Sequence, residues 1–242
     1  MAISMFTIIP LPKYKWNDEG SKHIMKFYPL IGLIVGGVWY GTYKLLFLID
    51  TSTMLISAIT MVVPFIITGM LHLDGYMDVC DAVLSRRDKK EKIRILKDPN
   101  TGAFSVISLA ILFIINFSAT YTIVDNGWNV IALVLIPVIS RSLIGFLLLT
   151  KESMPESSLG SYFKKGTGLM DKIILMVILI LSIILLIFLL GFKSLGISIA
   201  MVFITILVVN NSCKELGGMS GDTAGYGLVI AETIGLLIVA LM

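Results

Sequence analysis

The sequence predicts an all-α, polytopic membrane protein with about seven transmembrane helices. Of its 242 residues, 57% are hydrophobic and only 14% are charged, against roughly 25% charged residues in an ordinary soluble domain. The mean hydropathy is +0.94. A soluble protein of this size could not bury so many apolar side chains, so the composition excludes a disordered chain, a secreted disulfide-rich module and most soluble enzymes.

Apolar runs long enough to cross a bilayer recur along the whole chain, which we expect to form a single membrane domain over residues 1–242. A transmembrane helix needs about 20 apolar residues. We expect Pro64 to kink the second span, because proline removes one backbone hydrogen bond. The last span contains an acid, Glu232. The predicted spans are 28–49, 54–73, 103–124, 130–149, 172–192, 195–211 and 224–242.

Lys and Arg are distributed unevenly between the connections, and this asymmetry predicts the orientation. With these spans, 16 of the 19 basic residues fall on one side, counting those before span 1, those in the 74–102, 150–171 and 212–223 loops, and Lys172 at the start of the fifth span. We therefore expect a multi-pass protein of the cell membrane with a cytoplasmic N-terminus, an external C-terminus and no cleavable signal peptide. The cytoplasmic loops are also the long ones, so the active site is expected on that side.

The two cysteines, Cys80 and Cys213, form no CxxC motif and no Cys/His cluster, so a zinc site is not expected. Basic residues occur in short clusters between apolar runs rather than on a broad basic face. This is typical of a protein in contact with a lipid bilayer and not of one that binds nucleic acid.

An acidic segment follows the second predicted span. Asp74, Asp78 and Asp81 are spaced i, i+4 and i+7, so on a helix they share one face. Carboxylates on one face repel each other, and Mg²⁺, which prefers hard oxygen ligands, would relieve that repulsion. The alternative is an acidic helix end in water, although solvated faces usually mix signs. We therefore expect these three aspartates to bind a metal that handles phosphates.

The basic stretch over residues 86–102 predicts a helix on the membrane surface that ends in a turn. In that turn, Lys97 could meet a phosphate and Asp98 could add a ligand to the acidic cluster, or both could be solvated. Arg141 lies inside the fourth span, where an arginine is costly and usually faces a polar interior. Its planar guanidinium suits a phosphate; the alternative is an ion pair that packs two helices.

A glycine-rich stretch precedes the last span and can present backbone N–H groups to a phosphate. Its spacing is not that of a P-loop, because no GKS or GKT follows, and a flexible turn is the alternative. Glu232 lies ten residues beyond Asp222, about 15 Å along a helix, which places it in the bilayer as a candidate functional acid. The candidates in this stretch are Lys214, Gly217, Gly218, Ser220, Gly221 and Asp222.

Acids for a metal, cations for phosphates and a glycine-rich turn thus meet at one membrane face. Together they indicate phosphoryl or nucleotidyl transfer on a large or amphipathic substrate. These residues do not identify that substrate.

The motifs resemble those of the cobalamin synthase family, the adenosylcobinamide-GDP ribazoletransferases, over nearly the whole chain. Departures occur at Ile8, where the family often has arginine, at Ser220, which replaces threonine, and at Val229, where the family tends to have an acid. The matching segments are FTIIPLP at 6–12, PLIG at 29–32, HLDGYMDVCDA at 72–82, KDPNTGAF at 97–104, SR at 140–141 and GGMSGDT at 217–223.

The resemblance implies that adenosylcobinamide-GDP reacts with α-ribazole, or its 5′-phosphate, to give adenosylcobalamin, or its phosphate, and GMP, with Mg²⁺ as cofactor. Our hypothesis for the mechanism is that Asp74, Asp78 and Asp81 hold the metal, with Asp98 as a further candidate ligand, and that Lys97 and Arg141 neutralise charge. His72 or one aspartate would be the general base. Substrate contacts are implied for Asp98, Gly102, Lys214, Gly217, Gly218, Ser220, Gly221, Asp222 and Glu232. A homo-oligomer is a possible form.

Two other functions are compatible with parts of the pattern. CDP-alcohol phosphotransferases also use an Asp-Gly-led acidic motif and a divalent metal, but their pattern continues as DGxxAR and GxxxDxxxD, and this chain has Asp78-Val79 in place of AR and lacks the second half. A secondary transporter would place its site near the midplane at an inverted-repeat interface. The chain shows no internal repeat, and its acidic cluster lies at the cytoplasmic mouth.

Overall fold

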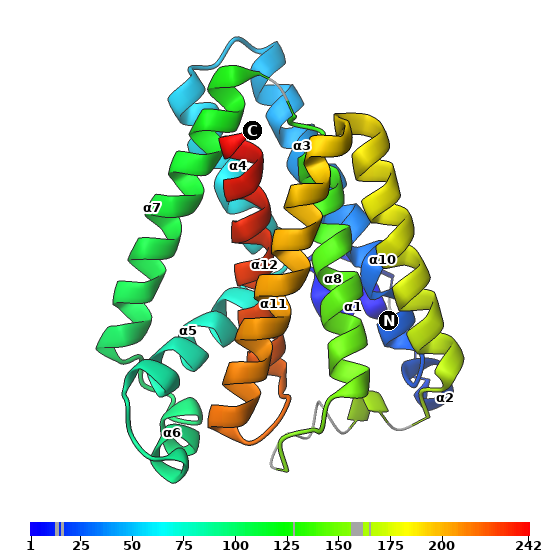
Figure 1. Ribbon diagram of the computed structural model, residues 1–242, viewed down its shortest axis with the longest axis vertical. Coiled ribbons are helices and arrows are strands. Elements are labelled where there is room, and N and C mark those ends of the chain that lie inside the picture. The colour runs from blue at the N-terminus through cyan, green and yellow to red at the C-terminus, as the bar shows by residue number, and fades with distance from the viewer. Residues whose placement is uncertain (13–14, 16, 128, 156–161, 165) are drawn as a thin grey trace.

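The computed structural model describes residues 1–12, 15, 17–127, 129–155, 162–164 and 166–242, and the described chain is a bundle of helices (Figure 1). Its only extended pairing within those residues is an isolated bridge between Ser153 and Met219. The all-α fold class is confirmed. The short elements are α1 (Ala2–Phe6), α2 (Asp18–Ser21), η1 (Ile24–Phe27), α6 (Lys89–Leu96) and η2 (Phe192–Ser194).

Within the part of the chain that the structure describes, six helices are long and apolar enough to cross a membrane, and each of their predicted counterparts begins within three residues of the observed start. Apolar composition sustained over about 20 residues is a strong signal, which is why these predictions succeed. The six are α3 (Tyr28–Leu48), α7 (Ala103–Asn126), α8 (Ala132–Thr150), α10 (Leu169–Leu190), α11 (Leu195–Leu216) and α12 (Gly221–Leu241).

The second predicted span is not one continuous helix. It is divided into α4 (Thr53–Ile67) and α5 (Leu71–Leu84), which are bent by 90° relative to each other. The break lies at residues 68–70, where Gly69 and Met70 both have φ of 61° in the left-handed region, and not at Pro64, which α4 contains. Prediction from composition alone missed this break, because the apolar run continues through it.

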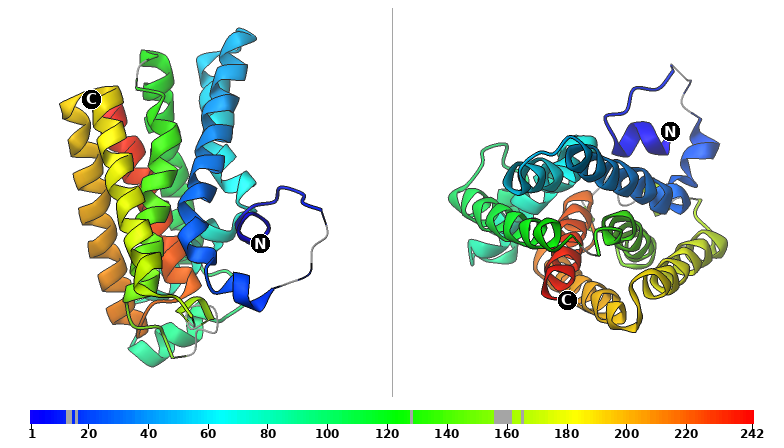
Figure 2. Two further views of the ribbon diagram at one scale, coloured as in Figure 1. Left: turned by 90° about the vertical axis from the view of Figure 1, so that its right-hand side faces the viewer. Right: turned by 90° about the horizontal axis from the view of Figure 1, so that it is seen from above.

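The N-terminal segment satisfies part of the backbone at this break. A helix of 15 residues is only about 22 Å long, so α4 ends inside the apolar thickness, where free carbonyls are costly. The Ile8 N–H donates to the Ile67 carbonyl at 2.9 Å, and the Thr68 hydroxyl donates to the Pro64 carbonyl at 2.8 Å. Figure 2 shows this N-terminal segment outside the bundle, beside α3. It therefore caps the broken helix.

Helix α8 is the central helix, since 89% of the residues in its apolar window are buried. It contacts α3 closely because two glycines of α3 remove side chains from the interface. A Cβ added at Gly32 would lie 2.4 Å from the Pro137 carbonyl oxygen, and one at Gly36 would lie 2.4 Å from that of Val134. Small residues allow transmembrane helices to pack in this way.

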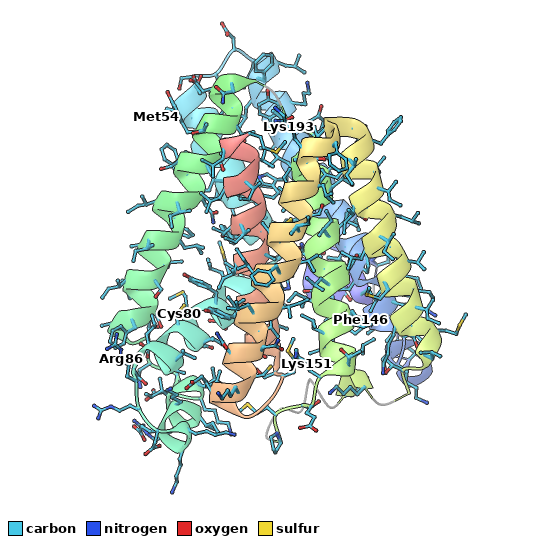
Figure 3. All side chains as sticks on the ribbon, viewed as in Figure 1. Met54, Cys80, Arg86, Phe146, Lys151 and Lys193 are labelled. Atoms are coloured by element: carbon cyan, nitrogen blue, oxygen red, sulfur yellow. The ribbon has the colours of Figure 1, made fainter. Side chains whose placement is uncertain are left out.

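The basic connections gather at one end of the bundle. Figure 3 shows Arg86 and Lys151 toward the end that carries α6, and Lys193 at the opposite end. Lys13 and Lys165, which were counted among the basic residues of the first end, lie outside the described residues. The arrangement agrees with the charge asymmetry of the sequence.

Candidate active site

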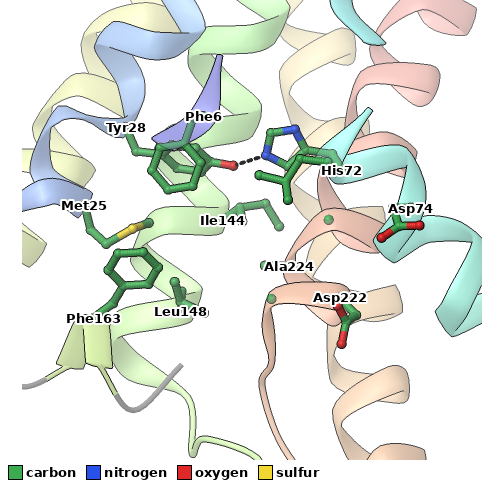
Figure 4. A pocket seen from close by; sticks show the side chains of 13 residues that line it. Phe6, Met25, Tyr28, His72, Asp74, Ile144, Leu148, Phe163, Asp222 and Ala224 are labelled. Carbon is green, nitrogen blue, oxygen red and sulfur yellow. Dashed lines mark hydrogen bonds between the residues drawn. The ribbon is translucent and has the colours of Figure 1, made fainter. Parts of the chain in front are cut away.

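Helices α5 and α12 approach each other through glycines, and this contact brings two acids together. A Cβ at Gly75 would lie 2.9 Å from the Cα of Asp222, and one at Gly225 would lie 3.0 Å from the carbonyl oxygen of His72. Any side chain at these positions would separate the helices. The close approach sets Asp74 of α5 and Asp222 of α12 at the rim of the same cavity (Figure 4).

This cavity has a volume of about 110 Å³, smaller than the about 300–1,000 Å³ of typical small-molecule sites, so it fits one part of a ligand rather than a whole large one. Its polar side chains are the two aspartates and the Tyr28–His72 pair, and the rest of its wall is apolar. The cavity is lined by Phe6, Met25, Tyr28, Leu71, His72, Asp74, Ile144, Leu148, Phe163, Gly221, Asp222, Ala224 and Gly225.

Four carboxylates of α5 and α12 form a like-charged group. Asp78 is half-buried and lies within electrostatic range of Asp74, Asp222 and Asp81, in that order of strength. Asp222 also interacts with Asp74 and receives a 3.4 Å hydrogen bond from the Ser220 hydroxyl. Hard oxygen donors that repel one another suit a divalent cation. Within the described residues, however, no three His, Cys, Asp or Glu side chains are oriented to hold a metal ion.

The three aspartates predicted as metal ligands all lie on α5, but their surroundings differ. Asp74 lines the cavity. Asp81 lies against the N-terminus of α7, where a Cβ at Gly102 would come within 2.1 Å of its Oδ2 atom. Gly102 is the N-cap of α7, so its lack of a side chain makes room for the Asp81 carboxylate. Asp222, predicted as a substrate contact, interacts electrostatically with both Asp74 and Asp78, which the sequence pattern alone did not indicate.

Behind the cavity lies a buried network of charged and polar side chains. Tyr28 and His72 are joined by a hydrogen bond of 2.7 Å between the hydroxyl and Nε2, and both residues are buried. Arg141 forms an ion pair of 2.5 Å with Glu232 and is 1% exposed. The Ser140 hydroxyl donates to the same Glu232 oxygen at 2.9 Å. His72 Nδ1 and Arg141 Nε are buried without a hydrogen-bond partner in the described chain.

This network places Arg141 and Glu232 outside the cavity lining. Each is the partner of the other, which is the packing ion pair that the sequence left open for Arg141. The Arg141 guanidinium lies 5.9 Å from the Tyr28 ring centroid, so the ion pair supports the wall of the cavity rather than its interior. The predicted contacts of these two residues with substrate stay predictions.

The turn that carries Lys97 and Asp98 lies apart from the cavity. Lys97 is the C-cap of α6. The Asp98 carboxylate accepts hydrogen bonds from the Asn100 backbone N–H at 2.9 Å and from its side-chain amide at 2.8 Å. These hydrogen bonds hold the pKa of Asp98 below its usual range. Asp98 is thus engaged in its own turn and does not join the acidic group.

The glycine-rich stretch separates two cavities. Gly221 and Asp222 line the cavity described above, whereas Lys214, Gly217 and Gly218 line an open one together with Lys89 and Lys151. Ser220 caps α12, since its hydroxyl accepts from the Thr223 N–H at 3.2 Å. Gly217 and Gly218 have φ of 92° and 145°, values that favour glycine. The stretch is therefore an ordered turn. Lys89, Lys151 and Lys214 lie on one side of it, and Asp74 and Asp222 lie on the other.

Sequence reasoning missed the apolar wall of the cavity and its tyrosine. Tyr28 begins α3, next to Pro29, and nothing in its neighbourhood in the sequence marks it. Phe6 belongs to the FTIIPLP segment at 6–12, but no feature of the sequence assigns it, Met25, Leu148 or Phe163 to a common wall. Only the packing of α1, η1 and α8 around α5 reveals them.

The fold and the site define a multi-pass membrane protein with an acidic site suited to phosphate chemistry. The family model described as cobalamin-5-phosphate synthase matches residues 1–240, and the chain belongs to this family. It is thus a transferase of cobalamin biosynthesis, as the motifs implied.

The chain is also similar to curated relatives over nearly its full length. It is 51% identical to an adenosylcobinamide-GDP ribazoletransferase of Clostridium botulinum (strain Alaska E43 / Type E3), over 98% of this chain and 94% of the relative. It is 46% identical to that of Clostridium perfringens strain ATCC 13124, over 100% and 96%, and 30% identical to that of Lachnoclostridium phytofermentans, over 96% and 88%. No solved structure matches the chain.

Proposed function

We propose that this protein transfers adenosylcobinamide phosphate from adenosylcobinamide-GDP to α-ribazole or its 5′-phosphate, with release of GMP. Family membership and the names of the relatives support the reaction. The observation that locates the active site is that Asp74 and Asp222, from two different helices, both lie at the rim of one cavity.

In this reaction a ribazole hydroxyl forms a bond to the phosphorus that bears the cobinamide side chain. The bond from that phosphorus to the bridging oxygen breaks, and the oxygen leaves with GMP. The hydroxyl proton passes to a base, for which the cavity offers Asp74, Asp222 and His72. The Nε2 atom of His72 is held by Tyr28, so the aspartates are the better placed of the three.

The acidic group fits a Mg²⁺ ion by the chemistry of its donors. Asp74, Asp78 and Asp222 would hold the ion, while Asp81 faces α7. Bound there, Mg²⁺ would neutralise charge on the pyrophosphate oxygens. The Gly75 and Gly225 contacts bring α5 and α12 close together, so that Asp222 lies within electrostatic range of Asp74 and Asp78, and the apolar wall lies on one side of this group.

We further propose that the protein lies in the cell membrane with the basic end, and therefore the mouth of the site, in the cytoplasm. The positive-inside rule supports this orientation, which gives a cytoplasmic N-terminus and an external C-terminus. Both substrates would then reach the acidic rim from water.

Parallel incubations test the proposed reaction. Detergent-purified protein is given adenosylcobinamide-GDP with α-ribazole, or a CDP-alcohol pair, and the released nucleotide is separated by chromatography. We expect GMP that depends on ribazole, and no CMP. Release of CMP without GMP would assign the chain to the alcohol phosphotransferase chemistry, and movement of an intact solute without either nucleotide would indicate transport.

A further inference from the structure

The cavity has two chemically different ends. At its rim lie the carboxylates of Asp74 and Asp222, and the opposite wall is formed by Phe6, Met25 and Phe163 (Figure 4). Phe6, Met25 and Phe163 come from three separate segments of the chain. Their side chains are 6%, 2% and 2% exposed, so together they form one closed apolar surface. A ligand that fills the cavity must therefore be apolar at one end and phosphate-directed at the other.

We propose that this apolar end is the subsite for the base of α-ribazole, and that Phe6, Met25, Leu148 and Phe163 determine specificity for it. The proposal rests on the proposed function. The base is a flat, dimethylated benzimidazole without N–H or carbonyl groups, and it is bonded through ribose to the hydroxyl that reacts.

The aromatic residues of this wall suit a flat ring. Phe6 lies 4.6 Å from Tyr28 and 6.2 Å from Phe163 between ring centroids, distances at which aromatic rings attract each other in tilted arrangements. A planar bicycle at this wall extends the same kind of contact. Met25 and Leu148 complete the wall with flexible and aliphatic side chains, which adapt to methyl groups.

Two polar atoms of this end are already paired, whereas His72 Nδ1 has no partner within the described residues. The Tyr28 hydroxyl and His72 Nε2 bond to each other at 2.7 Å. A guanine at this end would bury an amide, an amino group and ring nitrogens, and each unpaired group costs about 1–3 kcal/mol. The benzimidazole of a riboside brings only one such group, a ring-nitrogen acceptor, and no donor. The competing arrangement places guanine in the cavity with its donor edge on Asp74 or Asp222. The two arrangements predict different changes in KM when the apolar wall is altered.

This placement also orders the reacting groups. With the base against Phe6 and Phe163, the ribose lies toward the rim, beside Asp74 and Asp222. Its hydroxyl then meets the pyrophosphate where the carboxylates gather. The nucleotide half of the other substrate is left to the cytoplasmic opening, next to the lysines that line the second cavity.

The first test changes the substrate and leaves the protein intact. Wild-type enzyme is assayed with ribosides of dimethylbenzimidazole, of benzimidazole and of adenine as acceptors. We expect kcat/KM to fall about fourfold for each methyl removed, from the transfer free energy of a methyl group, and further for adenine. Equal kcat/KM values for all three bases would overturn the proposal.

The second test is the Phe6→Ala variant, with Phe203→Ala as a matched control, because Phe203 lies on α11 and is 65% exposed, away from the cavity. We expect a rise of tenfold or more in KM for α-ribazole in Phe6→Ala, with KM for adenosylcobinamide-GDP within twofold of wild type, and no change in the control. A rise confined to adenosylcobinamide-GDP would place guanine at this end and overturn the proposal.

The failure of the subsite can be told from the failure of the proposed function. Wild-type protein that releases no GMP with any riboside refutes the function. Wild-type protein that is active, with an unchanged KM for α-ribazole in Phe6→Ala, refutes only the subsite. If Phe6→Ala does not fold, the acceptor series on wild type decides alone.

Discussion

Two aspartates that the sequence pattern treats alike have different surroundings in the fold. Asp222 lies at the rim of the cavity, among the carboxylates of α5. Asp98 lies in an exposed turn and bonds to Asn100. Both were predicted to contact substrate or metal; only Asp222 lies beside the acidic residues of α5 in the structure, and both roles stay predictions.

We predict that Asp222→Asn lowers kcat for GMP release by at least ~100-fold, since a metal-held phosphate contact contributes several kcal/mol to the transition state. Asp98→Asn, the matched change in the turn, is expected to stay within about twofold of wild type, as for most surface substitutions. Turnover of both purified variants measures this. Equal losses of kcat in Asp222→Asn and Asp98→Asn would contradict the different roles proposed for these two aspartates.

Arg141 and Glu232 are two charged residues that the sequence places within the membrane spans, but the sequence does not show that they pair with each other. The sequence shows two ionisable residues within spans, which are functional candidates by default. It does not show that α8 and α12 bring them into contact with each other. That pairing depends on the rotation of both helices, which no local pattern specifies.

Glu232→Gln is therefore predicted to destabilise the protein by about 3–5 kcal/mol, because it leaves Arg141 buried without its counter-ion. Thermal unfolding in detergent measures the loss. The double variant Arg141→Met/Glu232→Met is expected to recover most of the stability, because replacing both partners avoids an uncompensated charge. A double variant no more stable than Glu232→Gln would contradict the account of this pair.

At the scale of elements, adjacent glycines of α3 have opposite surroundings. Gly36 faces the backbone of α8, whereas a Cβ at Gly37 would meet nothing within 4 Å. We predict that Gly36→Ala destabilises the protein by about 1–3 kcal/mol through overpacking. Gly37→Ala should be neutral or stabilising by about 0.5–1 kcal/mol, as alanine favours helix. Unfolding midpoints of the two variants, one residue apart, give the comparison.

The break between α4 and α5 gives a second prediction at this scale. Ile8→Pro removes the N–H that donates to Ile67 and is expected to destabilise the protein by about 1–3 kcal/mol. Thr7 already has the extended backbone that precedes proline comfortably. Ile8→Ala keeps the N–H and serves as control. If both variants unfold at the wild-type midpoint, the N-terminal segment does not stabilise the break.

The spans were predictable because each is one long apolar run, and the break was not. Residues 68–70 interrupt the helix through backbone conformation, and a single Gly69 in an apolar segment is a weak signal. The consequence is large, since the bend turns α5 toward α12 and gives the acidic motif its partner, Asp222. The acidic residues were thus found from the sequence, whereas their geometry required the fold.

At the scale of the whole molecule, the charge asymmetry predicts which end faces the cytoplasm. With Cys80 and Cys213 replaced by alanine, single cysteines are placed at Arg86 and at Lys193, which lie toward opposite ends of the bundle (Figure 3). A membrane-impermeant maleimide added to intact cells should label the Lys193→Cys variant alone. Labelling of Arg86→Cys alone would reverse the orientation.

The whole molecule also shows why the cavity wall escaped prediction. It is assembled from α1, η1, α8 and the segment containing Phe163, which are far apart in sequence. In a chain with 57% hydrophobic residues, no single apolar side chain stands out. Motifs identified the polar half of the site and included Phe6, but only tertiary packing shows that Phe6, Met25 and Phe163 form one wall.

The central claim is that the carboxylates of α5 and α12 form a Mg²⁺-dependent site for transfer from adenosylcobinamide-GDP to ribazole. The most direct measurement is GMP release by purified wild-type protein, with α-ribazole present or omitted, over a titration of Mg²⁺ after chelation. We predict GMP only when both ribazole and Mg²⁺ are present, with activity restored as Mg²⁺ is added back. Undiminished GMP release in the chelated, metal-free protein would contradict the claim.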